Sequence, residues 1–407
     1  MRRPTGFRTA YDGVVLAAPV TVPYQRFSKE SAHHWIARAL RGSLTAARIS
    51  PTELDGFSVA SFTLFPDTAV GLTQHLGLAP RWLDHIPTGG ASGITALRRA
   101  ARAVQAGDVD VVACVAGDTN HIDSFRRLLS SFSRFAQDAS WPYGSGGPNT
   151  SFGLLTDHYM HAFGATREDF GRLCVSQRSN ALRNPHAIMK EPLTMAQYLS
   201  ARLISDPIAL YDCVMPVAGA EAFLVLRETD AVAQGLPFAC IRSTIERHNA
   251  FAADPVQMRG GWAVDVDELY GMAQAAPTDV DLVQTYDDYP VITMMQIEDL
   301  GFCEKGEGGA FVGDGNIGPG GSLPVNTNGG GLACVHPGMY GMFVTIEAVD
   351  QLRGSCGARQ IDDKGAAAGA DQKGAKHACL ILSATLQNFS EVVATYRTEI
   401  SSYLYCL

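Results

Sequence analysis

One supersecondary unit occurs twice in the chain: a glycine-rich loop, then a helix with one apolar side, then a short apolar strand. In the first copy, a helix that begins near Ser92 precedes the wholly apolar run Val111–Val115. In the second copy, Phe343–Leu352 has apolar residues at helical spacing, and Ala378–Leu382 supplies the strand. Short apolar runs beside helices are typical of buried parallel strands. The repetition therefore predicts an α/β protein with two related halves.

The expected halves are residues 1–230 and residues 231–407. The composition changes between about 120 and 215, where Ser130–Asn149 is rich in Ser, Gly and Pro with interspersed aromatic residues. Long loops in compact domains often cover a substrate, so we expect residues 120–215 to be a substrate-covering loop region. Gly365–Lys376 is rich in Ala, Gly and Lys, and it is expected to be a surface insertion without chemistry.

Composition excludes several classes of protein. The chain has 407 residues, of which 46% are hydrophobic and 18% charged, so it can bury a large core. A net charge of −9 argues against nucleic-acid binding. No stretch approaches the roughly 20 apolar residues of a membrane span. The first residues do not resemble a secretory signal, and the nine cysteines lack metal-ligand spacing. We expect a cytoplasmic protein with reduced thiols and no bound metal.

The segment with the most chemical information is Asn326–Gly338, which reads NTNGGGLACVHPG. Its adjacent glycines, Gly329 and Gly330 among them, allow the backbone to approach a ligand closely or to adopt a positive φ. His336 follows on a loop that Pro337 stiffens. A histidine held in this way is well placed to transfer a proton or to donate to an oxyanion, and the alternative is a structural histidine that caps the loop.

The same segment resembles the signature of a known family. Asn-x-Asn-Gly-Gly-x-Leu-x-x-x-His-Pro at residues 326–337 is similar to the glycine and His-Pro signature of thiolases. Gly301–Gly309, Asn184-Pro185 and Gln351–Gly354 resemble the sterol-carrier-protein-x branch. The resemblance implies two related halves that form a layered αβαβα sandwich. It also implies a homodimer that binds a CoA thioester at the junction of the halves and needs no cofactor.

The nucleophile of the family is missing from its expected place. Thiolases carry the acyl-accepting cysteine in a Cys-x-Ser-Gly element before a long helix, and here that element reads Gly90-Ala91-Ser92-Gly93. Gly90 has no side chain, so it cannot form an acyl-enzyme. The helix N-terminus can still bind an oxyanion. Ser92 is a weak substitute, because the sequence identifies no base to activate it.

Two other family positions carry groups that transfer protons. A His or Asn starts a short element after a strand in the family, and here Tyr286-Asp287-Asp288-Tyr289 follows the expected strand Val280–Thr285. Tyr286 thus takes the place of the imidazole, and a phenol can serve as an acid, a base or a hydrogen-bond donor. The alternative is a buried structural tyrosine. The family's other histidine corresponds to His336. The stretch Ser383–Asn388, where a second catalytic cysteine would stand, contains none.

These positions imply a reaction without an acyl-enzyme. We expect a C–C bond beside a CoA thioester to be made or broken through an enolate. Tyr286 and His336 are the expected catalytic residues. The oxyanion or substrate would be bound by Gly90, Ser92, Asn326, Gly329, Gly330 and Tyr340.

Two alternatives to this expectation remain open. One is a retro-aldolase acting on a β-hydroxyacyl-CoA, because lipid-transfer-protein aldolases also lack the nucleophile and have a similar Tyr-Asp-x-Phe element. These aldolases join a small OB-fold zinc protein, which is therefore a possible partner. The other alternative is a non-catalytic subunit that binds acyl-CoA or lipid.

Overall fold

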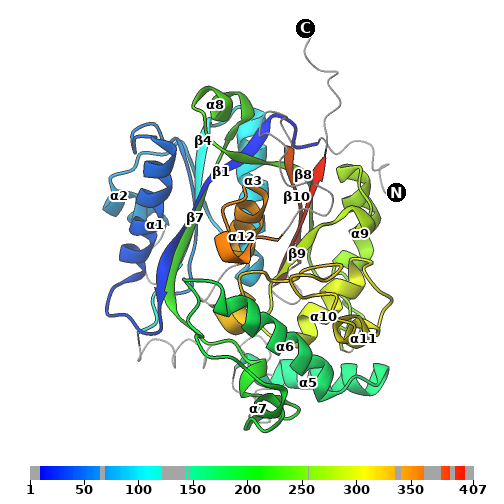
Figure 1. Ribbon diagram of the computed structural model, residues 1–407. Coiled ribbons are helices and arrows are strands. Elements are labelled where there is room, and N and C mark those ends of the chain that lie inside the picture. Colours follow the sequence, from blue (N-terminus) through cyan, green and yellow to red (C-terminus); the bar gives the residue numbers. More distant parts are fainter. Residues whose placement is uncertain are drawn as a thin grey trace.

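The computed structural model describes residues 10–64, 69–121, 144, 147–254, 256–334, 341–361, 377–385 and 390–398. Two of the expected site residues, His336 and Tyr340, lie outside these ranges, as does the insertion Gly365–Lys376. The described strands form one mixed nine-stranded sheet and a small two-stranded sheet. Helices lie on both sides of the large sheet and in the space that its two ends enclose (Figure 1).

The N-terminal part of the large sheet has the strand order β3-β2-β4-β7-β1. β2 is parallel to both β3 and β4, whereas β7 is antiparallel to its neighbours β4 and β1. Every residue of β4 is buried, which is expected of a strand covered on both faces. The bounds are β1 Val14–Gln25, β2 Gly56–Ala60, β3 Trp82–His85, β4 Val111–Asp118 and β7 Ala218–Arg227.

The sheet continues into the C-terminal part through β1, which pairs with β8 over Val15–Ala17. The order there is β8-β10-β11-β9, with β10 parallel to β8 and β11 antiparallel to both β10 and β9. The last strand, β11, therefore does not lie beside the first strand of its part, unlike β7 beside β1. The bounds are β8 Phe238–Arg247, β9 Leu282–Thr285, β10 His377–Thr385 and β11 Ser390–Thr398.

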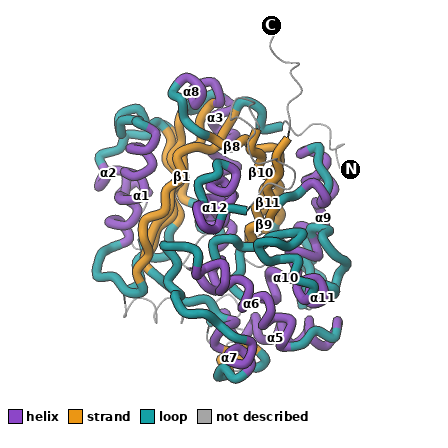
Figure 2. Tube along the Cα trace, in the orientation of Figure 1, coloured by secondary structure: helices purple, strands orange, loops and turns teal. Residues whose placement is uncertain are grey.

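The helices complete a layered α/β sandwich, as the sequence predicted. α3 and α12 lie together in the middle layer, between the N-terminal and C-terminal strands (Figure 2). α1 and α2 lie beyond the N-terminal strands, and α9 packs on β8 and β10 at the other side. The bounds are α1 Ala32–Ala47, α2 Ala69–Leu76, α3 Ser92–Ala106, α9 Trp262–Ala273 and α12 Met342–Leu352.

The described part of the expected loop region 120–215 is largely helical. α6 begins with a capping-box pair, in which the Asp169 carboxylate accepts hydrogen bonds of 2.8 Å from the backbone nitrogen and the hydroxyl group of Thr166. α5, α6 and α10 pack together below the sheet in Figure 1. None of the described helices is long and apolar enough to cross a bilayer. The bounds are α5 Pro148–Phe163, α6 Arg167–Leu182, α7 Met195–Leu199, β5 Leu203–Ser205, β6 Ile208–Ala209, α8 Glu228–Ala233, α10 Pro290–Asp299 and α11 Gly308–Gly313.

Candidate active site

The N-termini of the two middle helices meet at Gly90. This residue lies in the short turn Gly89–Ala91 that leads into α3, and its carbonyl oxygen accepts a hydrogen bond of 2.9 Å from the backbone nitrogen of Gly341. Gly341 is in turn the N-cap of α12. Helix N-termini carry partial positive charge and leave N–H groups without partners inside the helix. The meeting point is therefore suited to an anionic or polarised oxygen.

Ser92 is fully buried at the first position of α3. Its hydroxyl donates to the carbonyl oxygens of Gly89 at 2.6 Å and Ile86 at 3.2 Å. A hydroxyl whose proton is bound to backbone carbonyls has no base to remove that proton. Ser92 therefore stabilises the turn that contains Gly90.

Tyr286 lies in the core, with its ring centroid 6.2 Å from that of Phe343 on α12. Its side chain hydrogen-bonds to the Asp288 carboxyl group, and this bond lowers the pKa of the acid. Burial outweighs that effect and raises the pKa of Asp288 from 3.8 to about 7. The carboxyl group beside the phenol is therefore suited to take up or release a proton near neutral pH.

Asp287 joins the Tyr286 element to the glycine-rich loop. Its carboxylate accepts hydrogen bonds from the backbone nitrogens of Gly331 at 2.6 Å and Leu332 at 3.1 Å. The side chain is 1% exposed, and burial raises its pKa from 3.8 to about 8. One buried carboxyl group thus holds together the Tyr286–Tyr289 element and the glycine-rich loop, which are more than 40 residues apart in the sequence.

The glycines of the loop are required by its neighbours. Gly329 has φ +103°, and a Cβ there would stand 2.6 Å from the Cβ of Ala181 on α6. Gly330 has φ +62°, and a Cβ there would stand 2.3 Å from Asp287 Oδ2. Both glycines therefore permit close packing of the loop, in addition to any contact with a ligand.

Asn326 is fully buried with a left-handed backbone (φ +47°). Its Oδ1 accepts a hydrogen bond of 2.6 Å from the backbone nitrogen of Thr285, at the end of β9. Its Nδ2 has no hydrogen-bond partner among the described residues. The Oδ1 atom of Asn326 thus binds the end of the strand before Tyr286, whereas its Nδ2 atom is a hydrogen-bond donor without a partner among the described residues.

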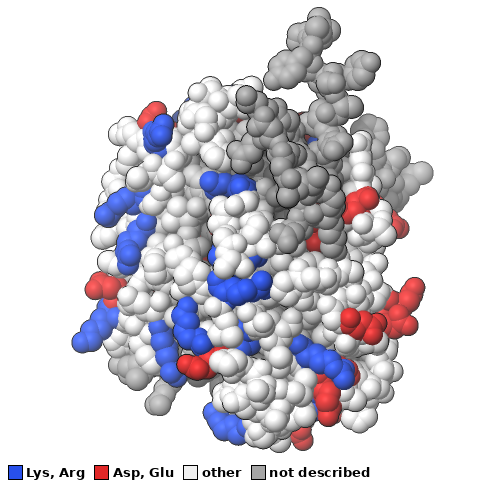
Figure 3. Space-filling view, in the orientation of Figure 1, with Lys and Arg blue, Asp and Glu red and all other residues white. Residues whose placement is uncertain are grey.

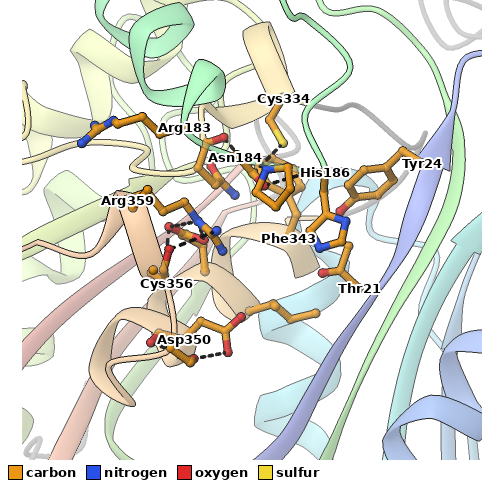
Figure 4. A pocket seen from close by; sticks show the side chains of 17 residues that line it. Thr21, Tyr24, Arg183, Asn184, His186, Cys334, Phe343, Asp350, Cys356 and Arg359 are labelled. Carbon is orange, nitrogen blue, oxygen red and sulfur yellow. Dashed lines mark hydrogen bonds and ion pairs between the residues drawn. The ribbon is translucent and has the colours of Figure 1, made fainter.

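A cavity of about 530 Å³ opens beside the glycine-rich loop and α12. Asn328 and Cys334 line it from the loop, and Phe343 and Glu347 line it from α12. Glu347 is neutralised by Arg359, whose Nε lies 2.9 Å from its Oε2. Tyr24, Arg183, His186 and Arg359 also line the cavity, and Figure 4 shows that the Arg183 guanidinium points away from the other three side chains.

None of the predicted site residues that the structure describes lines this cavity itself. Gly90, Ser92 and Tyr286 lie around the start of the middle helices, and Asn326, Gly329 and Gly330 lie in the loop that Asp287 holds. His336 and Tyr340 are outside the described residues. The flanking residues are placed: Cys334 lines the cavity, and Gly341 contacts Gly90.

Sequence reasoning missed two polar residues: Tyr24, which lines the cavity from β1, and Glu221, which is buried in β7 and does not line it. The Tyr24 hydroxyl donates to the Glu221 carboxyl group. A signal for Glu221 was present, since it is the one acidic residue in the apolar strand AGAEAFLVLR. Among the described residues, no cluster of three or more His, Cys, Asp or Glu side chains could hold a metal ion.

Comparison with known proteins defines the family. Residues 244–384 match a model described as thiolase C-terminal domain-like. A 17-hydroxy-3-oxo-4-pregnene-20-carboxyl-CoA lyase of Mycobacterium tuberculosis is 30% identical over 371 residues, covering 83% of this chain and 92% of the lyase. An acetyl-CoA acetyltransferase of Methanothermobacter thermautotrophicus is 30% identical over 343 residues, covering 80% of this chain and 87% of that enzyme.

The fold agrees with this relationship. A structure described as Ltp2-ChsH2(DUF35) aldolase superposes with a TM-score of 0.77 at 24% identity, covering 94% of this chain and 98% of the other. The chain belongs to the thiolase superfamily, in its sterol-carrier-protein-like branch. It is an enzyme that makes or breaks a carbon–carbon bond, as the sequence predicted.

Proposed function

We propose that this enzyme acts on a β-hydroxyacyl-CoA by retro-aldol chemistry, without a covalent acyl-enzyme. The observation that carries the proposal is Gly90, a residue without a side chain in the turn that starts α3. The nearby Ser92 hydroxyl is bound to backbone carbonyls, so it does not substitute for a thiol. The similarity to the mycobacterial CoA lyase supports cleavage.

The reaction has three steps. The β-hydroxyl group loses its proton to a base, and the bond between the α- and β-carbons breaks, so that the β-carbon leaves as a carbonyl. The bonding electrons move onto the thioester as an enolate, which then takes a proton at the α-carbon. The enolate oxygen needs preorganised donors. In the proposal, Tyr286 and His336 flank the thioester, one donating to this oxygen while the other moves the proton.

The cavity offers one arginine that could contact a CoA thioester. Two arginines, Arg183 and Arg359, and two acids, Glu347 and Asp350, line the cavity. Arg359 is paired with Glu347, whereas Arg183 makes a 2.6 Å hydrogen bond to the neutral Asn180 amide. Figure 3 shows Lys and Arg side chains over the left and middle of this face with a few Asp and Glu side chains among them, whereas most charged side chains toward α9 and α11 are acidic. The basic side chains of this face would attract the phosphate groups of CoA.

The proposal includes partners. The Ltp2-ChsH2(DUF35) aldolase has the same fold, which supports a complex of this chain with a small OB-fold zinc-binding subunit. A homodimer and a cytoplasmic location also remain part of the proposal, on the strength of the family resemblance and of the composition.

One assay tests the function. The purified protein, alone and with a candidate DUF35-type subunit, is incubated with acetyl-CoA, β-ketoacyl-CoA and β-hydroxyacyl-CoA panels, and the products are analysed by mass spectrometry. We expect β-hydroxyacyl-CoA to yield a carbonyl compound and a shortened acyl-CoA, with no mass added to the protein. An acyl adduct on the chain would contradict the proposal. Binding without conversion in every panel would instead indicate a non-catalytic subunit.

A further inference from the structure

A bulge in β1 brings Thr21 and Tyr24 to the same wall of the cavity. Residues three apart on a regular strand point to opposite faces. In β1, Val22 pairs with Ala220 but Gln25 pairs with Ala218, so β1 has one more residue than β7 in this interval. The bulge turns the strand, and both side chains line the cavity. Thr21 also hydrogen-bonds to Tyr24.

The Tyr24 ring packs against β7. Gly219 and Glu221 are two residues apart, so they occupy the same face of this strand. A Cβ at Gly219 would stand 2.4 Å from the Cδ1 atom of Tyr24, so the ring lies directly over the glycine. Glu221 lies beyond it and receives the hydroxyl hydrogen bond. The position of the phenol is therefore fixed at both its ring and its oxygen.

Glu221 is fully buried, and its Oε2 atom has no hydrogen-bond partner among the described residues. Burial raises its pKa from 4.5 to about 8, so the carboxyl group is mostly protonated at neutral pH. The Tyr24 hydroxyl donates its proton to Glu221, so the phenol oxygen keeps a lone pair that can accept a hydrogen bond from a ligand. Tyr24 can therefore bind a hydroxyl group in the cavity.

We propose that Tyr24, positioned by Glu221, accepts a hydrogen bond from the hydroxyl group on the β-carbon of the acyl group. The inference rests on the proposed function. A β-hydroxyacyl thioester carries two oxygens that need partners, and Tyr286 and His336 are assigned to the thioester oxygen. Tyr24 packs against the same core cluster as Tyr286, Cys334 and Phe343, and it reaches the cavity from β1 (Figure 4). Tyr24 is thus a binding residue and Glu221 a positioning residue.

The test compares two CoA thioesters that differ in this oxygen. The full-length protein is titrated with 3-hydroxybutyryl-CoA, as separate enantiomers, and with butyryl-CoA, and the dissociation constants are measured by calorimetry at pH 7. In the wild type we expect one hydroxy enantiomer to bind about tenfold more tightly than butyryl-CoA. Tyr24→Phe should abolish that ratio and leave the affinity for butyryl-CoA unchanged.

Further variants separate positioning from simple damage. Glu221→Gln can still hydrogen-bond to the phenol, so this variant should keep most of the preference for the hydroxy thioester over butyryl-CoA. Glu221→Leu should lose that preference. Gly219→Ala should also lose it, because the ring is displaced while the tyrosine remains. Tyr270→Phe is the matched control, since it removes a buried phenol bond to the Leu300 carbonyl away from the cavity. It should keep the wild-type ratio.

The outcomes distinguish this inference from the proposed function. Wild-type protein that binds all the thioesters equally, or a Tyr24→Phe variant with an unchanged ratio, would refute the role of Tyr24 and leave the retro-aldol proposal intact. Wild-type protein that binds none of them would refute both.

Discussion

The Asp287 carboxylate accepts a hydrogen bond of 2.6 Å from the backbone nitrogen of Gly331. This contact, with the second bond from Leu332, holds the loop that precedes His336 against the element that carries Tyr286. Asp287→Ala would leave two buried N–H groups without partners. We expect the free energy of unfolding to fall by about 3 kcal/mol, measured by urea denaturation. A loss below about 1 kcal/mol would mean that other contacts hold the loop.

Gly330→Ala should be far more damaging than the same change at Gly354. Both glycines have a positive φ, +62° and +68°, so both variants carry backbone strain. Only at Gly330 would the new Cβ also overlap a side chain, at 2.3 Å from Asp287 Oδ2, whereas Gly354 has nothing within 4 Å. We expect Gly330→Ala to cost at least about 2 kcal/mol more in denaturation experiments. Equal losses would show that strain alone requires the glycine.

Tyr286→Phe should reduce turnover of a cleavable β-hydroxyacyl-CoA by about a hundredfold with the fold intact. The change removes the hydroxyl paired with Asp288 and keeps the ring that packs near Phe343. Steady-state kinetics and circular dichroism measure the two effects. Tyr289→Phe is the control, because the Tyr289 hydroxyl bonds to Asn149 at 2.6 Å instead. Equal losses in the two variants would count against a specific role for Tyr286.

His336→Ala should cut turnover by at least about a hundredfold while the protein stays folded. The reason is the expected loss of a donor or proton carrier at the enolate. Single-turnover kinetics at saturating substrate separate this effect from weaker binding. Wild-type turnover in the variant would end the assignment.

Glu221 should make stability fall as pH rises. Its folded-state pKa, about 8, lies above its ordinary value of 4.5, so the folded protein holds a proton that the unfolded chain releases in this interval. The contribution is fully present below pH 4.5 and is lost as pH rises through about 8. Glu221→Gln lacks this dependence and should become progressively more stable than the wild type between pH 5 and 8, by at most about 1.4 kcal/mol per pH unit. Denaturation curves at three pH values test this, and parallel behaviour of the two proteins would contradict it.

Local patterns predicted the elements that depend on neighbouring residues. The helix expected from Ser92 is α3, and the apolar run Val111–Val115 lies within β4. The helical content of the region 120–215 was not predicted, although the capping box at Thr166 and Asp169 was a local signal for α6. The amino-acid composition of this region had indicated a loop and had given no sign of helices.

The contacts that build the site depend on residues far apart in the chain. Asp287 and Gly331 are 44 positions apart, and Tyr24 and Glu221 are 197 positions apart. No spacing rule links such pairs, because only the folded sheet brings them together. The sequence could indicate that Tyr286 and the glycine-rich loop belong to one site through the family resemblance, but it could not identify the buried carboxyl group that joins them.

The strand that carries Tyr24 also joins the two parts of the large sheet, since β1 pairs with β7 on one side and with β8 on the other. The contact with β8 covers only Val15–Ala17, whereas the end of β1 that carries Tyr24 pairs with β7. A substrate bound by this phenol would therefore be held by the N-terminal part of the sheet.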